Sequence, residues 1–502
     1  MEFAFPSFPI LLSFLVFVFM VLKIWKRSKT NDTTLNLPPG PWKLPVIGNL
    51  HQLVGSLPHH RLRDLAMKYG PFFHLQLGEL STIIVSSPEF AKEVMKTHDV
   101  TFASRSYVPV LHTMTYDSSD IALSPYGDYW RQLRKIGTLE IFSTKRVQSF
   151  RSIREEEVSN LINWIASKAG SVINLTDTFY SLTNVITSRA AFGNKCKDGE
   201  KFLSLITETT ELAGGFSIAD LFPSIEGLLQ RITRIKSQVE KMFQEVDQIF
   251  ENIINEHKKG KSEGNEDLID VLLRVQEDGD DGFHLATNSI KAVIWDVFAA
   301  GSETSATTID WAMSELMKNP GVMKKAQVEV REIFNRNGKV DETGINEMKF
   351  LKLVIKETLR LHPPLPLILP RECRERCEIK GFEIPIKTRM MVNVWAIGRD
   401  PKYWSEPESF IPERFLDSSI DYKGTNFEFI PFGSGRRMCP GIIFAVSTIE
   451  LALALLLYHF DWKLPNAMKH EDLNMTESFG LTVRRKEDLY MIPIPYHPPS
   501  AV

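Results

Sequence analysis

A short stretch near the C-terminus places a cysteine among residues that could hold a cofactor. Residues 431–441 read Pro-Phe-Gly-Ser-Gly-Arg-Arg-Met-Cys-Pro-Gly, and Cys439 is the cysteine. The glycines allow tight turns, and the apolar run 442–457 has helical character. The positive end of that helix, with Arg436 and Arg437, would favour thiolate over thiol. A thiolate in such a loop is the ligand of a cysteine-bound haem iron. A buried structural cysteine is the alternative, but the spacing Phe-x-x-Gly-x-Arg-x-Cys-x-Gly is more constrained than that alternative needs.

The segment 288–318 forms a second group of candidate residues. Its pattern is that of a long helix, and Thr287 before it is a suitable N-cap. Residues 300–301, Ala-Gly, would let a ligand approach the backbone, and Glu303 and Thr304 follow them. A hydroxyl supported by a carboxylate and ordered water can relay protons to dioxygen while bulk water stays out. A tight helix crossing, with Thr304 bonded to a preceding carbonyl, is the alternative.

Further charged residues could build the surroundings of a haem. Glu357 and Arg360 lie on one face of an expected helix, and Arg414 follows in a Pro-Glu-Arg-Phe run. One carboxylate between two guanidinium groups would form a strong, directional network if it were buried. The two propionates of a haem also need cationic or indole N–H donors. The candidates for this role are Trp130, Arg134, Arg371 and Arg437.

Composition is that of a large domain with its own core. The chain has 502 residues, of which 43% are hydrophobic and 24% charged. The formal net charge of -3 gives no case for nucleic-acid binding. Four cysteines in a chain of this length indicate a reducing compartment without a disulfide framework. Cys373 and Cys377 have no second ligand pair beside them, and we interpret them as spectators.

Residues 1–29 form an expected membrane anchor. The run 8–22 is almost wholly apolar, and with the apolar residues before it approaches the length that spans a bilayer. Four basic residues follow it, and a single acidic residue precedes it. This asymmetry predicts a cytosolic body and no cleaved signal peptide. Residues 30–45 contain a proline-rich hinge that would orient the remaining domain, 46–502, against the membrane.

Together these motifs resemble those of the cytochrome P450 enzymes, and more narrowly the plant microsomal clan of specialised metabolism. The resemblance covers essentially the whole chain, and the overall sequence is similar to plant sesquiterpene oxidases and casbene-type diterpene oxidases. It implies a mainly α fold with a small β-rich lobe, behind an N-terminal transmembrane helix. It also implies haem b with Cys439 as the metal ligand, and Thr304 with Glu303 as the proton-delivery pair. The Glu357, Arg360 and Arg414 group would support the haem face.

The reaction that the resemblance implies is an NADPH- and O2-dependent monooxygenation. The thiolate would favour O–O cleavage at the haem iron. The chain has no dinucleotide-binding or flavin motif, so the electrons would come from NADPH through a partner reductase. The protein would lie in the endoplasmic reticulum membrane as a single-pass protein with a cytosolic catalytic domain. Candidate cations for the reductase-docking face are Arg131, Lys135, Lys145, Arg146 and Arg436.

The residues expected at the substrate are apolar. From the regions that contact substrate in the family, the expected pocket consists of Val110, Leu111, Met114, Phe216, Phe298, Ala299, Ala300, Leu367, Ile368, Leu369 and Phe479. Such a pocket favours an apolar terpene, and we favour hydroxylation of a casbene-like macrocyclic diterpene, with further oxidation to a ketone or epoxidation as variants.

Other activities remain open at this point. Within the family, the alternatives are a sesquiterpene hydroxylase, an alkaloid hydroxylase and a fatty-acid epoxygenase. A reductase-independent haem-thiolate isomerase or lyase is an alternative class, and Thr304 counts against it because such relatives tend to lose this threonine. A non-catalytic haem protein is a further alternative.

Overall fold

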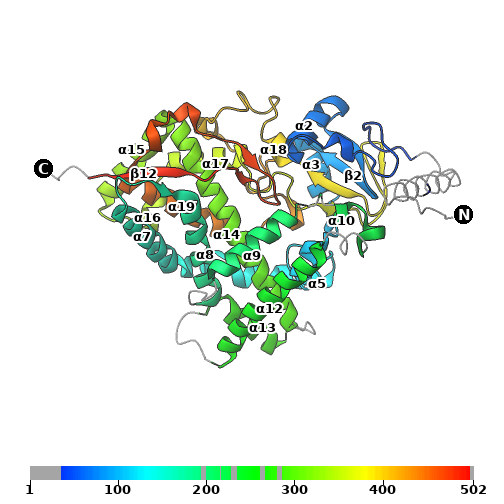
Figure 1. Ribbon diagram of the computed structural model, residues 1–502, viewed down its shortest axis with the longest axis horizontal. Coiled ribbons are helices and arrows are strands. Elements are labelled where there is room, and N and C mark those ends of the chain that lie inside the picture. Colours follow the sequence, from blue (N-terminus) through cyan, green and yellow to red (C-terminus); the bar gives the residue numbers. More distant parts are fainter. Residues whose placement is uncertain are drawn as a thin grey trace, which may run out of the picture.

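The computed structural model describes residue 18 and residues 35–193, 199–214, 216, 218–227, 234–259, 266–279 and 285–497. The expected anchor, 1–29, lies outside the described residues apart from Val18. The anchor and the division of the chain at residues 30 and 46 therefore stay predictions. The described part has a β-rich lobe beside a larger helical body (Figure 1).

The lobe is built on a five-stranded sheet in the order β1-β2-β8-β5-β3. The strands are β1 (Phe72–Leu77), β2 (Leu80–Val85), β8 (Arg389–Val392), β5 (Arg371–Glu372) and β3 (Ser104–Arg105). β1 and β2 form an antiparallel hairpin, and β2 pairs with β8 in parallel. β3 and β5 pair antiparallel, so that Arg105 lies opposite Arg371. This pairing brings two arginines from distant parts of the chain to the edge of the lobe.

Short helices flank this sheet, and small sheets complete the β structure. The helices are α2 (Pro58–Tyr69), α3 (Pro88–Lys92) and α18 (Val394–Ile397). One three-stranded sheet joins β4 (Ile173–Asn174), β12 (Tyr490–Pro495) and β9 (Phe460–Lys463). β6 (Cys377–Ile379) pairs with β7 (Phe382–Ile384), and β10 (Glu477–Ser478) pairs with β11 (Arg484–Arg485). The β10–β11 hairpin is the one that bears on the site, because it carries Phe479.

The helical body contains most of the remaining chain. Its longer helices are α5 (Asp128–Ile136), α7 (Arg151–Ser167), α8 (Leu175–Phe192), α9 (Gly199–Leu212), α12 (Ile235–Lys259), α13 (Leu268–Asp278), α14 (Thr287–Lys318), α15 (Pro320–Asn337), α17 (Lys349–Leu361) and α19 (Ile442–His459). Shorter ones are α4 (Pro109–Met114), α6 (Thr144–Ser149), α10 (Ile218–Leu221) and α16 (Glu342–Ile345). The expected mainly helical fold with a small β-rich lobe is confirmed.

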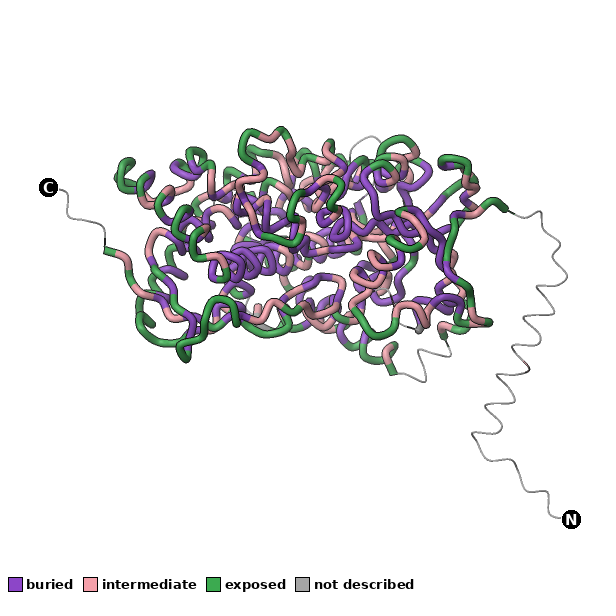
Figure 2. The backbone as a smooth tube through the Cα atoms, turned by 90° about the horizontal axis from the view of Figure 1, so that it is seen from above, coloured by how far each residue is buried: buried purple, intermediate pink, exposed green. Residues whose placement is uncertain are grey.

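α14 is the central helix of the body. It spans 32 residues, one more than the expected 288–318, and Ala286 rather than Thr287 is its N-cap. Buried residues occur on all of its faces, as expected of a helix enclosed by others. α8, α13, α17 and α19 pack against it. Figure 2 shows the buried segments running through the middle of the molecule with exposed segments around them.

α19 is the apolar helix that follows the cysteine loop. Within the described ranges, it is the one helix long and apolar enough to cross a membrane, and 61% of its residues are buried. Leu451, Leu453 and Leu456 are fully buried in a core shared with α7, α8, α14 and α17. Its apolar character therefore belongs to the protein core.

Candidate active site

A cavity lies where α14, the start of α19, the loop 431–441 and strand β5 meet. It encloses about 1750 Å³ of empty space, its open side included. Cys439 and Thr304 both lie on its wall, among arginines and mostly apolar side chains. The two chemical groups singled out in the sequence therefore face the same space.

The cysteine loop requires glycine at a defined point. Gly433 and Gly435 have positive φ angles of 70° and 71°. A Cβ on Gly435 would lie 2.0 Å from the carbonyl oxygen of Met95, so no other residue fits there. The Cys439 N–H donates to the Phe432 carbonyl at 3.0 Å, which closes the loop ahead of α19. This turn places the sulfur at the cavity.

The electrostatics at Cys439 differ from the expectation. Burial raises the pKa of the thiol, and the Gly441 N–H and Arg134 act against that shift. A bound metal ion would favour the thiolate, because a thiol that coordinates a metal is deprotonated.

The cation that lowers the pKa of Cys439 is Arg134, whereas the side chains of Arg436 and Arg437 bind other groups. The exposed Arg436 side chain lies 3.6 Å from the Asp99 carboxylate. Arg437 donates from Nε to the Ala103 carbonyl and from Nη1 to the Ile121 carbonyl at 3.2 Å. Both guanidinium groups are therefore committed to other partners. Arg437 nevertheless lines the same cavity as Cys439.

All four expected N–H donors line the cavity. Trp130 and Arg134 come from α5, Arg371 from β5 and Arg437 from the cysteine loop. The Trp130 indole N–H donates to the Ile121 carbonyl at 2.9 Å, and the Arg437 guanidinium lies 4.2 Å from the centre of the Trp130 ring.

Sequence reasoning missed Arg105, which also lines the cavity. Its Nε donates to the Ala122 carbonyl at 2.9 Å and its Nη1 to the Leu369 carbonyl at 2.7 Å. No local signal marks Arg105, because only the β3–β5 pairing sets it opposite Arg371.

This cluster of cations fits the propionates of a haem. Burial lowers the pKa of Arg105, Arg371 and Arg437, and repulsion between the guanidinium groups adds to the shift for Arg105 and Arg437. The buried Arg371 Nε has no hydrogen-bond partner among the described residues. Concentrated buried positive charge is costly unless anions compensate it. Two carboxylates would supply this compensation, and Cys439 would supply the iron ligand.

Thr304 and Glu303 do not act on the cavity as an adjacent pair. The Thr304 hydroxyl, on the cavity wall, donates to the Ala300 carbonyl at 2.6 Å, which is the local bond of the alternative interpretation. Gly301 also lines the cavity, and a Cβ there would lie 3.4 Å from Thr187 of α8, so small residues serve both the cavity and the helix crossing. Successive residues of a helix point about 100° apart, so Glu303 faces elsewhere.

The Glu303 side chain is buried on the face of α14 that is turned away from the cavity, beside Thr210 of α9. Its Oε1 accepts from the Thr210 hydroxyl at 3.2 Å. Burial raises the pKa of Glu303 to about 7, and hydrogen bonds from Thr210 and Thr482 and the charge of Arg484 oppose the rise. Glu303 therefore holds its proton to a higher pH than an exposed carboxyl, at a point that does not touch the cavity.

The structure brings Glu357, Arg360 and Arg414 together in the interior. The Glu357 carboxylate accepts from Arg360 Nε and Nη2 at 2.7 and 2.8 Å and from Arg414 Nε at 2.9 Å. The Ile411 N–H donates to the same carboxylate at 2.8 Å. Glu357 and Arg360 are fully buried. The network joins α17 to the Pro412–Phe415 turn.

Six of the expected pocket residues line a cavity. Ala300, Ile368 and Leu369 lie on the wall shared with Cys439. A second, smaller cavity includes Ile368 and Leu369 again, so the two adjoin. The other expected residues on its wall are Leu111, Leu367 and Phe479.

The other five are packed elsewhere. Phe298 is fully buried and lies 5.1 Å from the Phe192 ring and 4.6 Å from the Phe202 ring. Val110 and Met114 belong to the same core, and Ala299 packs against it. Phe216 packs against the core of the β-rich lobe, 6.0 Å from the Phe479 ring. Their apolar character serves the core, which is why composition did not separate them from wall residues.

Asp296 is a further cavity residue that was not expected. Its Oδ2 accepts from the Ile121 and Ala122 N–H groups at 2.8 and 3.1 Å. Burial and the neighbouring Asp120 carboxyl raise the pKa of Asp296 well above its usual range. The Asp296 carboxyl at the cavity wall is therefore harder to ionise than an exposed carboxyl. Its position on an otherwise apolar turn of α14 was the available signal.

The sequence matches the model of a known protein family and several characterised relatives. A family model described as Cytochrome P450 matches residues 38–491. The chain is 59% identical over 487 residues to Cytochrome P450 71D11 of Lotus japonicus, covering 95% of this chain and 99% of that protein. It is 53% identical over 492 residues to premnaspirodiene oxygenase of Hyoscyamus muticus, covering 97% of each. It is 54% identical over 497 residues to tabersonine 16-hydroxylase 2 of Catharanthus roseus, covering 96% of each.

A solved structure has the same fold. A zebra fish cytochrome P450 with progesterone matches with a TM-score of 0.75 and 25% sequence identity, and the match covers 88% of this chain and all of that one.

Proposed function

The chain belongs to the cytochrome P450 family, whose members are haem monooxygenases that take electrons from NADPH through a reductase, and we propose that this enzyme oxidises an apolar plant terpene. The observation that carries the assignment of the site is the single cavity that Cys439 and Thr304 share. A bound haem supplies the centre that activates dioxygen for insertion of one oxygen atom into the substrate.

The protein's own residues have separate tasks in this proposal. Cys439 would bind the iron. The residues that would bind the propionates are Trp130, Arg134, Arg371 and Arg437, with Arg105 as a further donor on the same wall. The Thr304 hydroxyl donates its hydrogen bond to the Ala300 carbonyl, so its oxygen remains an acceptor that can hold a water at the cavity wall.

Glu303 has a supporting role in the proposal. Because its side chain lies on the face of α14 that is turned away from the cavity, Glu303 exchanges protons with the cavity only through intervening groups or water. It therefore acts as a proton reservoir, and Thr304 is the residue next to the reacting atoms.

The preferred substrate is a casbene-like macrocyclic diterpene, with a sesquiterpene as the second candidate. The side chains of Ala300, Ile368 and Leu369 offer an apolar wall, and the adjoining second cavity extends it. The resemblance to a premnaspirodiene oxygenase supports a terpene. The resemblance to a tabersonine hydroxylase supports an alkaloid instead, but the mostly apolar wall of the cavity favours the terpene.

The test measures oxidation of a panel of candidate substrates in the presence and in the absence of NADPH. Microsomes that contain the enzyme and its reductase would receive casbene, premnaspirodiene and tabersonine, with products read by mass spectrometry. We expect an oxygenated casbene product that requires NADPH. Oxidation of tabersonine without oxidation of casbene or premnaspirodiene would contradict the terpene assignment.

The same experiment separates the other classes of function. Product without NADPH would indicate an isomerase or lyase, and a substrate-induced spin shift with no product would indicate a non-catalytic haem protein.

We also place the enzyme in the endoplasmic reticulum membrane, anchored once through residues 1–29, with the reductase docking near the cysteine loop. Four of the five candidate cations are exposed there: Arg131, Lys135, Lys145 and Arg436. Arg146 is half-buried and pairs with Glu266. Deleting residues 2–29 should release the protein from membranes, and full retention would contradict this anchor.

A further inference from the structure

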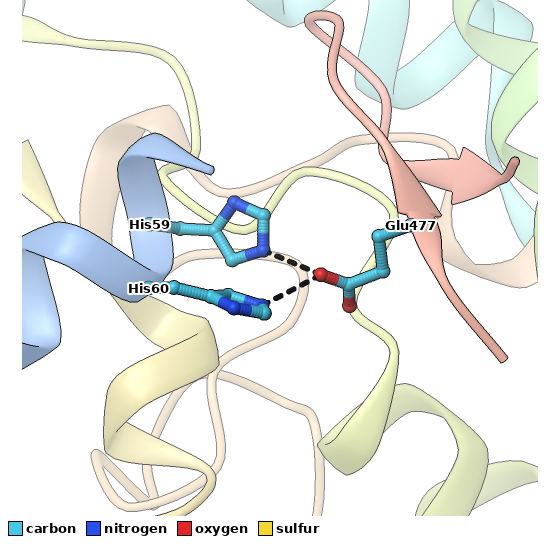
Figure 3. Close-up of side chains that lie close together, drawn as sticks. All are labelled: His59, His60 and Glu477. Atoms are coloured by element: carbon cyan, nitrogen blue, oxygen red, sulfur yellow. Dashed lines mark hydrogen bonds and ion pairs between the residues drawn. The ribbon is translucent and has the colours of Figure 1, made fainter. Parts of the chain in front are cut away.

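Three side chains of metal-binding type meet where α2 contacts the β10–β11 hairpin. His59 and His60 lie in the first turn of α2, and Glu477 lies in β10. The Nε2 atom of each histidine is 2.8 Å from the same Glu477 oxygen, and Figure 3 shows both rings directed at it. The three ligand atoms lie within 4.8 Å of one another. None of these residues lines the haem cavity.

The side chains are of types that bind zinc. His59 is fully buried, and the Glu477 side chain is 8% exposed. The cluster offers two imidazoles and one carboxylate, a ligand set that zinc enzymes use.

The geometry needs only a small adjustment. Zn²⁺ binds imidazole nitrogen and carboxylate oxygen at about 2.0–2.2 Å, so neighbouring ligands of a tetrahedral site lie roughly 3.3 Å apart. The present N–O separations must open by about half an ångström. The His60 side chain is 32% exposed and can move, and its exposed side leaves room for water. The Glu477 carboxylate accepts from His59 Nε2, so metal binding at Nε2 requires the ring proton to lie on Nδ1. His59 Nδ1 has no partner within the described residues.

The positive charges nearby are neutralised. Arg63 and Arg399 lie 5.0 and 4.0 Å from the centre of the Trp395 ring, which stacks on His60. Arg399 Nε donates to Glu408 at 3.0 Å, and Arg63 lies 3.2 Å from Asp64 and 3.5 Å from Glu408. These carboxylates reduce the repulsion that a divalent ion would meet.

We propose that His59, His60 and Glu477 bind one divalent transition-metal ion, for which Zn²⁺ is the best fit, with water completing the coordination. The ion would tie α2 to the hairpin in which Phe479, two residues beyond Glu477, lines the cavity beside the haem site. Metal binding and the shape of the substrate pocket are thereby linked.

The test is a Zn²⁺ titration of the haem-loaded protein, stripped of metal with a chelator and placed in competition with a chromophoric zinc indicator. Wild type should bind one equivalent. His60→Ala removes a partly exposed ligand and should weaken Zn²⁺ binding by a factor of about 100 or more. Glu477→Gln, which keeps a hydrogen-bond acceptor, should do the same. Unchanged haem content in both variants shows that they have folded.

Two matched controls remove other possible sites. His257→Ala disrupts a second cluster of His257, Asp267 and Asp270, and Cys377→Ser removes one of two neighbouring thiols. Both should bind Zn²⁺ as wild type does. Equal affinity in wild type and His60→Ala, or loss of the bound equivalent in either control, would overturn the proposal.

Discussion

Arg360→Ala should lower the free energy of unfolding by about 3–5 kcal/mol. The fully buried Glu357 carboxylate has Arg360 and Arg414 as its two cationic partners. Removing Arg360 halves that compensating charge while the carboxylate stays in the interior. The Gly398 and Pro407 carbonyls also lose their donor, because Arg360 Nη1 binds both, at 2.6 and 2.7 Å. The penalty is that of an uncompensated buried charge together with lost hydrogen bonds.

The assay is urea unfolding of the haem-loaded protein followed by far-ultraviolet circular dichroism, with midpoints compared at constant slope. The matched control is Arg336→Ala, which breaks an ion pair with Glu347 whose side chains are 62% and 51% exposed. That variant should lose less than about 1 kcal/mol. If Arg360→Ala unfolds within about 1 kcal/mol of the control, burial does not govern this network and the reasoning is refuted.

Three further outcomes are expected. Thr304→Ala should divert electrons to peroxide, so that product per NADPH consumed falls; an unchanged ratio would remove Thr304 from proton delivery. Glu303 has a pKa of about 7 in the fold against 4.5 for the free group, so its stabilising contribution is complete below pH 4.5 and is lost as the pH rises to 7. This loss amounts to about 3 kcal/mol. Glu303→Gln should flatten that part of the unfolding profile, and an unaltered profile would show that the carboxyl is not buried in solution. Leu369→Ala, on the cavity wall, should alter the product pattern, whereas Phe298→Ala should cost about 3–5 kcal/mol of stability and leave the pattern unchanged; the reverse result would restore Phe298 to the pocket.

Features that depend on a few consecutive residues were predictable. The cysteine loop contains its own turn residues, so the position of Cys439 followed from Gly433 and Gly435. The apolar pattern of α14 gave its extent to within one residue. The spacing of Glu357 and Arg360 placed them on one helix face. Arg414 pairs with the same Glu357 carboxylate, because a buried carboxylate is stabilised by a second cation.

Features that depend on distant segments were not predictable. Arg105 reaches the cavity only because β3 pairs with β5. Glu303 and Phe298 carry suitable side chains, but the rotation of α14 about its axis decides which of its faces meets the cavity, and its pattern is apolar on all sides. Arg436 and Arg437 are near Cys439 in sequence, yet partners from remote loops, including Asp99 and Ala103, bind them.

The account depends most on the sulfur of Cys439 as the iron ligand. The most direct measurement is the absorption spectrum of the reduced, carbon monoxide-bound protein, compared between wild type and Cys439→Ser. Wild type should show the strongly red-shifted band of a thiolate-bound haem, and Cys439→Ser should lack it. Persistence of that band in Cys439→Ser would contradict the account.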